Sequence, residues 1–275
     1  MIKRILVGLG DLPHARTATA AAVEIARATG AEVTGVTLFD PASLECCGPV
    51  PIGGGAYARE LEEARIKSAG DVIAAVTEAF VASCQQARLK HSVVNETGDP
   101  LTQLAADSRY HDLTICGLHG LFEHGVIAEP ADQMAAIVKA GVRPLLAVTG
   151  EERPVQRVLI AYSGSVESAK TMRRFVQSGL WRDAHLRIVT FQEDAELGRQ
   201  LLDDAAAYCL AHGLQPHTEC VPQAPDHHLL PYADQHKSDL IVMGNSAKNL
   251  LLRKIFGETA LHAMRNADRP LFLAQ

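Results

Sequence analysis

Short apolar, β-branched runs alternate along the chain with longer stretches in which apolar residues recur at helical spacing. The runs are of the length and composition of strands covered on both faces. The predicted strands cover residues 4–9, 32–39, 90–95, 113–116, 144–148, 158–161, 186–191, 217–221, 240–243 and 271–273. Strands that alternate with helices in this way predict an α/β fold, with parallel strands joined by right-handed crossovers.

Residues typical of helix termini separate these runs. Asp11 and Pro13 mark the start of a helix that runs to about Thr29, and Gly30 ends it. The other predicted helices cover about 61–87, 100–110, 131–140, a helix from Ser165, 195–212, a short helix ending at His236, and a helix from Thr259.

The chain repeats itself once. Gly117 and Gly244 are 127 residues apart (244 − 117), and Asp112 and Asp239 share that offset. The front strands repeat at an offset of 153, so the first copy carries an insertion of 26 residues (153 − 127). Ordered matches along the whole chain predict a duplicated unit. We therefore expect two domains, 1–150 and 151–275, each a doubly wound, five-stranded parallel sheet with helices on both faces.

Composition and net charge limit the kinds of partner that we expect for this protein. The net charge of −6 gives no overall basic field, so we expect no nucleic-acid partner. No apolar run reaches the length needed to cross a bilayer, so we expect no membrane span. The first residues read as a strand rather than an export signal. We therefore expect a cytoplasmic protein whose six cysteines are reduced thiols.

Two glycine patterns carry a resemblance to a known family. The second copy has Ser-Gly-Ser at 163–165, Gly-Asn-Ser-Ala at 244–247, nine residues, then Gly-Glu-Thr at 257–259. The first copy has Gly-Asp at 10–11, Gly-Leu-His-Gly at 117–120, nine residues, then Pro-Ala at 130–131. In order and spacing, the two copies resemble the universal stress protein fold, as a tandem pair over nearly the whole chain. The resemblance implies that the two fifth strands pair, giving an intramolecular pseudo-dimer, and leaves a further homo-oligomer open.

The resemblance also implies a site for an adenine nucleotide, ATP or AMP, with or without Mg²⁺. The adenine would lie near the first two strand ends, and the phosphates would lie on the glycine loop and the next helix start, where free N–H groups attract anions. In the second copy, the implied cofactor-binding residues are Ser163, Gly164, Phe191, Gly244, Lys248, Gly257, Glu258 and Thr259.

The charged residues of its loop make the second copy the better candidate for a nucleotide site. Lys248, Arg253 and Lys254 lie in its loop and can partly neutralise phosphates. Ala247, where the family pattern has glycine, and Glu258, where it has serine or threonine, oppose binding.

The first copy is a degenerate site. Pro130 has no N–H to donate, and Ala131 has no hydroxyl. Glu123 and Glu129 lie in its loop, which has no Lys or Arg. A triphosphate there would therefore meet negative charge and too few donors.

Two functional classes follow. The first is a stress-response protein that binds an adenine nucleotide in its second half, regulatory rather than metabolic, and at most a slow ATPase. The second is an adaptor that binds no nucleotide and acts through protein–protein or other small-ligand contacts. We assign no catalytic residue and no metal ligand, because no general base or metal constellation is visible.

Several residues have an alternative reading. Ser163 and Ser165 read as helix-start residues rather than nucleophiles, and Phe191 could equally pack in the core. The adjacent thiols Cys46 and Cys47 leave soft-metal binding or oxidant sensing open. The remaining cysteines follow the helix and strand patterns and are expected to be buried: Cys84, Cys116, Cys209 and Cys220.

Overall fold

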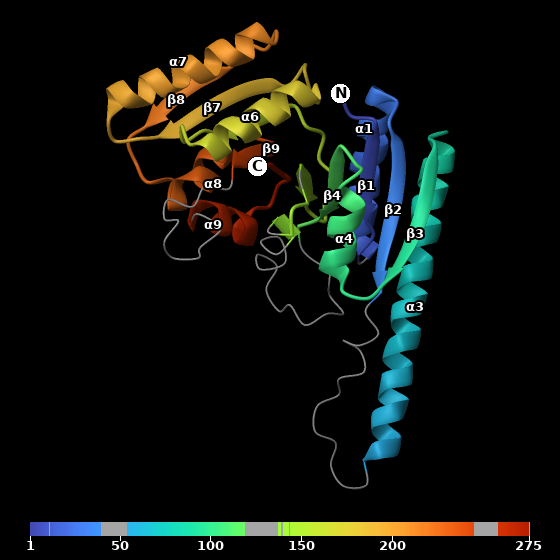
Figure 1. The fold of residues 1–275 in the computed structure, drawn as a ribbon. Helices are drawn as coiled ribbons and strands as arrows, with labels where there is room; N and C mark the ends of the chain where they lie inside the picture. The colour runs from blue at the N-terminus through green and yellow to red at the C-terminus, as the bar shows by residue number, and fades with distance from the viewer. Residues whose placement is uncertain are drawn as a thin grey trace. The chain divides into compact units, whose positions relative to one another are not determined.

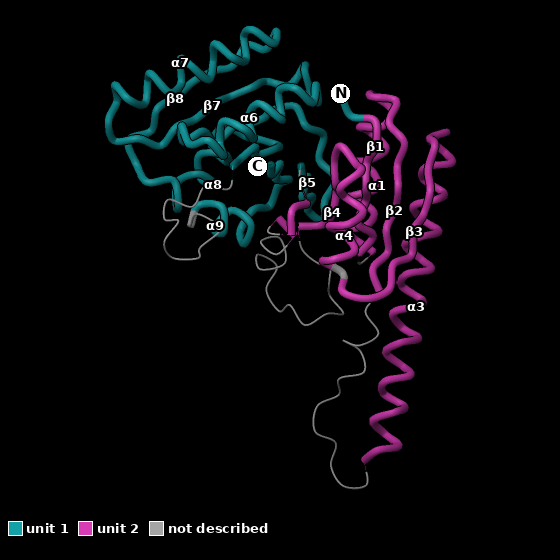
Figure 2. Tube along the Cα trace, in the orientation of Figure 1, with its two compact units in different colours: residues 1–2, 143–275 teal, residues 3–142 magenta. Residues whose placement is uncertain are grey.

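The computed structural model describes residues 1–10, 12–39, 54–118, 137–138, 140–142, 144–244 and 258–274. The chain forms two compact units (Figure 2). One contains residues 3–142, and the other contains residues 143–275 together with residues 1–2. In the described ranges, no helix combines the length and the apolar character that a membrane span requires.

The unit of residues 3–142 contains a parallel sheet with the strand order β3-β2-β1-β4 (Figure 1). Its strands are β1 (Arg4–Gly8), β2 (Glu32–Phe39), β3 (His91–Thr97) and β4 (Leu113–Gly117). Its described helices are α1 (Leu12–Thr29), α3 (Gly55–Gln86) and α4 (Pro100–Ser108). The strands β1 and β4 are buried almost throughout, as their continuous apolar runs predicted.

The second unit contains strands in the order β5-β10-β9-β6-β7-β8. Its strands are β5 (Leu145–Val148), β6 (Arg157–Ala161), β7 (His185–Phe191), β8 (His217–Val221), β9 (Leu240–Gly244) and β10 (Leu271–Ala274). Its helices are α6 (Val166–Ser178), α7 (Ala195–Ala211), α8 (Pro225–Gln235) and α9 (Glu258–Asn266). Neighbouring strands run parallel except β5 and β10. The expected α/β fold with doubly wound sheets is confirmed.

The two fifth strands pair, as the resemblance implied. β5 runs antiparallel to β10, with Leu146 opposite Phe272 and Ala147 opposite Leu271. All four residues are buried, so the contact lies in the core. Because of this pairing, β5 belongs to the second compact unit although it closes the first copy in sequence. The boundary between residues 150 and 151 stays a prediction about where the duplicated halves meet.

The duplication is also visible in the hydrogen bonds. The Asp112 carboxylate accepts from the backbone N–H groups of Lys3 (2.7 Å) and Arg4 (3.0 Å). The Asp239 carboxylate accepts in the same way from Gln156 (3.0 Å) and Arg157 (2.8 Å). In each copy, the aspartate before the fourth strand therefore fixes the start of the first strand.

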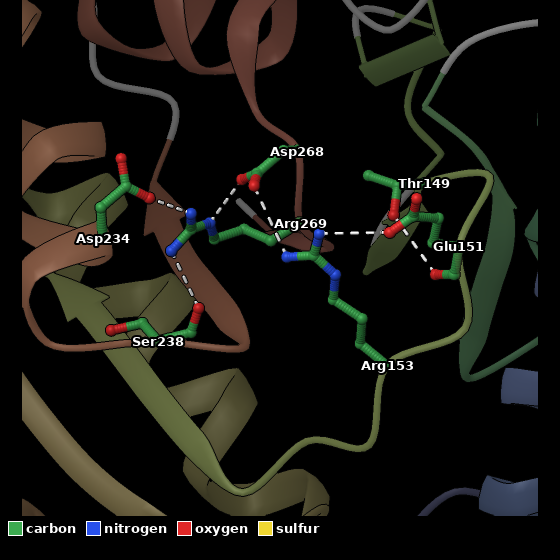
Figure 3. Close-up of polar contacts among 7 residues, drawn as sticks. All are labelled: Thr149, Glu151, Arg153, Asp234, Ser238, Asp268 and Arg269. Atoms are coloured by element: carbon green, nitrogen blue, oxygen red, sulfur yellow. Dashed lines mark hydrogen bonds and ion pairs between the residues drawn. The ribbon is translucent and has the colours of Figure 1, made fainter.

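A network around Arg269 holds the segment before β10 (Figure 3). Arg269 is buried, and its guanidinium donates to the carbonyl of Ser238 (2.9 Å) and to the carboxylates of Asp268 (2.8 Å) and Asp234. The second carboxylate oxygen of Asp268 lies 3.5 Å from the guanidinium of Arg153. The network thus ties the linker between the copies to the end of α8 and the start of β10.

The largest departure from the predicted boundaries is at α3. This helix begins at Gly55, although the glycine run at 53–55 predicted a loop there and a helix start near residue 61. Glycine disfavours a helix interior but is tolerated at its N-cap and first position, where Gly54 and Gly55 lie. Within the described residues, most other predicted boundaries agree within one or two residues, and the predicted helix at 131–140 lies largely outside them.

Candidate functional site

Three serine hydroxyls meet where β6 leads into α6. The Oγ of Ser163 lies 3.0 Å from that of Ser165 and 3.2 Å from that of Ser168. Ser165 is the N-cap of α6, and its Oγ accepts from the Ser168 N–H at 3.1 Å. Ser168 is buried, whereas Ser163 is exposed at the carboxyl end of the sheet. The expected capping role of Ser165 is confirmed, and Ser163 is an exposed residue whose hydroxyl belongs to the cluster.

Gly164, between Ser163 and Ser165, has a backbone conformation that favours glycine. Its φ is +72°, in the region that favours glycine, and an added Cβ would lie 2.5 Å from Cδ2 of Leu201. The glycine therefore sets the path of the turn that places Ser163.

Phe191 lies at the end of β7 and is half-buried. Its ring meets Tyr232 of α8 edge-on, with the centroids 6.2 Å apart. This contact fits the alternative reading of Phe191 as a packing residue, and a role beside an adenine stays a prediction.

Gly244 ends β9 against the first turn of α6. A Cβ on this residue would lie 2.7 Å from both Cα and N of Ser168, so no side chain fits unless the backbone moves. We expected a glycine for a tight turn and for close approach to a ligand. The structure shows that the close approach is to the α6 backbone, which brings the end of β9 beside the serine hydroxyls.

Thr259 lies in the first turn of α9, at the predicted anion site. Its hydroxyl donates to the carboxylate of Asp226, in the first turn of α8. Next to Asp226, the ring of His227 meets that of His262 on α9 edge-to-face, with the centroids 5.2 Å apart. Asp226 was missed in the sequence because it lies 33 residues before its partner. A carboxylate is therefore hydrogen bonded to the hydroxyl assigned to a phosphate.

Some of the predicted site residues lie outside the part of the chain that the structure describes. Lys248 and Gly257 lie outside the described residues, and Glu258 is described only as the first backbone position of α9. The other residues cited for or against binding, and the paired thiols, also lie outside the described residues: Cys46, Cys47, Glu123, Glu129, Pro130, Ala131, Ala247, Arg253 and Lys254. The proposed N-cap Asp11 is outside them as well.

Buried thiols behave as the pattern predicted. Burial raises the pKa of Cys84 to about 11, of Cys116 to about 12 and of Cys209 to about 11. These thiols stay protonated at neutral pH and are poor nucleophiles. Cys220 is only partly buried, and its Sγ lies 3.6 Å from the carbonyl of Gln192. Within the described part of the chain, no three His, Cys, Asp or Glu side chains form a group that could hold a metal ion.

Comparison with known proteins supports the fold and defines the family. The sequence pattern of the universal stress protein family matches residues 1–139 and again 154–275. A universal stress protein of Methanocaldococcus jannaschii is 30% identical over 80 residues, which are 29% of this chain and 47% of that protein. The chain thus spans about half the length of this curated relative.

Two solved structures extend the likeness to nearly the full chain. A universal stress protein from Archaeoglobus fulgidus aligns with a TM-score of 0.65 and 16% identity, covering 98% of this chain and 96% of that one. A protein of unknown function from Pseudomonas aeruginosa aligns with a TM-score of 0.59 and 16% identity, covering 99% and 92%. At these identities the likeness shows the fold alone. With the two family matches, however, the chain belongs to the universal stress protein family, in tandem form, and so to a class of stress-response proteins.

Proposed function

We propose that the second half of the chain binds an adenine nucleotide, ATP or AMP, in a regulatory role. The site would lie at the carboxyl ends of β6 and β9 and at the start of α9. Its residues would be the eight that the resemblance indicates, with Mg²⁺ as a candidate companion of ATP. Any hydrolysis would be slow, because no residue in the described site is arranged as an activated nucleophile or general base.

The strand order is the observation that carries this proposal. From β6 the chain moves outward through β7 and β8, and β9 then returns to the other side of β6. The strand order therefore reverses between β6 and β9, and ligands of open α/β sheets bind at the carboxyl side of such a point. Ser163 and Gly244 lie at the carboxyl ends of these two strands.

Helix geometry adds a reason for an anion at this edge. α6 starts at the serine cluster, and α9 starts at Glu258, next to Thr259. The first N–H groups of a helix lack intrahelical partners, and the helix dipole favours negative charge there.

Calorimetric titration with AMP and ATP, with and without Mg²⁺, tests the proposal. We expect one site per chain, and weaker binding by Ser163→Ala. Ser83→Ala, at a partly buried serine on α3 in the other unit, is the matched control and should bind like the unaltered protein. Absence of heat with every nucleotide, together with no nucleotide released when the purified protein is denatured, would overturn the proposal.

A second function is favoured by the Asp226 carboxylate. Its position at Thr259 places negative charge where phosphate would bind, which suits a neutral or cationic ligand, or a protein contact, better than a triphosphate. In that case the protein is an adaptor that binds no nucleotide, and the same titrations show no heat while the fold stays intact.

A further inference from the structure

Helix α3 is much longer than its counterpart in the second copy. It contains 32 residues, whereas α7 contains 17. Every buried α3 residue lies at position 69 or later: Ala69, Val76, Phe80 and Cys84. The preceding segment, residues 55–68, is here called the α3 arm. It is part of the first-copy insertion, and Figure 1 shows α3 continuing beyond the strands that it covers.

The α3 arm has little to stabilise it within the described part of the chain. None of its residues is buried, and Tyr57 is 72% and Ile66 36% exposed. Its N-cap, Gly54, supplies no side-chain hydrogen bond, and its first turn has no acidic residue. Isolated helices shorter than about 12–15 residues are marginal in water, and the arm is supported by its continuation into the packed part of α3. A partner on the arm would therefore stabilise it.

One face of the α3 arm has the pattern of a helix–helix seam. Tyr57, Leu61, Ala64 and Ser68 follow each other at spacings of four, three and four, which places them in one stripe. At about 100° per residue, this stripe points away from the face on which Ala69 packs into the core. Among the residues that the structure describes, no residue of this stripe is buried, while the later part of α3 packs into the core.

Charges beside the stripe are complementary to those of a second copy. Glu60 lies toward the N-terminal end of the arm and Lys67 toward its C-terminal end, on the same edge of the stripe. In an antiparallel pair with Leu61 opposite the partner's Ala64, Glu60 lies close to the partner's Lys67. Twofold symmetry makes this ion pair twice, which is the self-complementarity that an isologous interface needs.

We infer that the α3 arm pairs antiparallel with the arm of a second copy, joining two chains into a dimer. The contact involves only about four turns of helix, less than a standard-size interface. The dimer is therefore weak and concentration-dependent. This inference does not depend on the proposed nucleotide site.

Sedimentation equilibrium of the full chain over a wide concentration range tests the dimer. Leu61→Glu places a charge in the stripe and should weaken dimerisation at least about tenfold, the equivalent of about 1.4 kcal/mol. Ile66→Glu, on the same arm but outside the stripe, is the matched control and should keep the dimer. Helical content measured by circular dichroism checks that both variants fold.

A charge exchange tests the orientation. Glu60→Lys alone should weaken the dimer, and Glu60→Lys combined with Lys67→Glu should restore it, because only an antiparallel pair brings these two positions together. A failure of the double variant to restore the dimer would overturn the antiparallel arrangement.

Three further outcomes would overturn the inference as a whole. The first is a protein that stays monomeric at every concentration. The second is a dimer unaffected by Leu61→Glu, which would place the interface elsewhere. The third is strong hydrogen-exchange protection of the arm in the dilute monomer, which would show that it packs against its own chain.

Discussion

The hydroxyl of Thr259 donates a hydrogen bond to the carboxylate of Asp226, joining the first turns of α9 and α8. Both side chains are polar and both belong to helix starts, where the backbone attracts anions. If a phosphate binds here, as proposed above, it meets a threonine hydroxyl that is already hydrogen bonded to a carboxylate. Asp226 thus places a carboxylate beside the start of α9.

Asp226→Asn should tighten ATP binding. The change removes a charge that would lie about 4 Å from a phosphate, worth roughly 1–4 kcal/mol between bulk water and a protein surface. We expect ATP affinity to rise at least about fivefold and adenosine affinity to stay unchanged, measured by calorimetry. Asp203→Asn, an exposed aspartate on α7, changes the net charge equally and is the control. Equal gains for ATP and adenosine would contradict an electrostatic role.

Glu258→Ser should also tighten ATP binding. It removes a second carboxylate from the start of α9 and returns a hydroxyl to the position where the family pattern has one. The same titrations measure the effect, again with Asp203→Asn as the control. Unchanged affinity would mean that the Glu258 side chain turns away from the ligand.

Gly244→Ala should destabilise the second unit. The new Cβ would lie 2.7 Å from two backbone atoms of Ser168, and such overpacking costs roughly 1–3 kcal/mol. Gly70→Ala is the matched control, because a Cβ there meets open space in the interior of α3 and should stabilise by about 0.5–1 kcal/mol. Urea unfolding measures the change in the free energy of unfolding for both variants. A neutral Gly244→Ala would show that the strand end can move away from α6.

Arg269→Leu should be destabilising for a different reason. It removes the donor that Arg269 supplies to the Ser238 carbonyl and to the carboxylates of Asp234 and Asp268, and removing one partner of a buried pair costs about 3–5 kcal/mol. The loss should lie at or below that range because Asp234 and Asp268 are largely exposed. Arg199→Leu, which breaks an exposed pair with Glu196, should change the free energy of unfolding by at most about 1 kcal/mol. Similar losses in the two variants would contradict a structural role for the network.

His111 should make stability depend on pH. Burial lowers the pKa of its imidazole below the usual 6.5, and Nδ1 donates to the carbonyl of Asp107 at 2.7 Å. The unfolded chain therefore binds the proton more readily than the folded one, and the free energy of unfolding falls as pH drops through about 6.5. Burial raises the pKa of the Asp107 carboxyl, which acts in the opposite direction at lower pH.

Urea unfolding between about pH 7.5 and 5.5 covers the range in which the imidazole of the unfolded chain takes up its proton, near pH 6.5. His111→Gln should flatten the pH dependence over this window. His185→Gln, an exposed histidine at the start of β7, is the control and should leave the slope unchanged. An unchanged slope in His111→Gln would assign the dependence to another group.

The fold could be predicted because strand and helix patterns are local. The stretch 32–39 alternates and is β-branched, and it forms β2 with the predicted boundaries. The duplication could be predicted because Asp112 and Asp239 occupy equivalent positions in the two copies. The structure shows that both aspartates make the same backbone hydrogen bonds, which is a physical reason for the same residue at both positions. The start of α3 was missed because a glycine run disfavours a helix interior yet can begin a helix.

The site was less predictable because it depends on contacts between distant residues. No spacing rule joins Thr259 to Asp226, which lies on another helix. The steric role of Gly244 likewise depends on where Ser168 lies in space. The sequence predicted a site at the carboxyl edge of this sheet, which stays a prediction, whereas the structure supplied the carboxylate beside Thr259 and the backbone contact at Gly244.

The antiparallel pairing of β5 with β10 determines how the chain could be divided. A cut after residue 150 would leave β5 on one fragment and β10 on the other, so both would lose the neighbour that covers an apolar sheet margin. The simplest way to cover both margins is for the two fragments to reassociate. We therefore expect a chain cut at this position to give two fragments that fold by associating with each other, rather than two independent proteins.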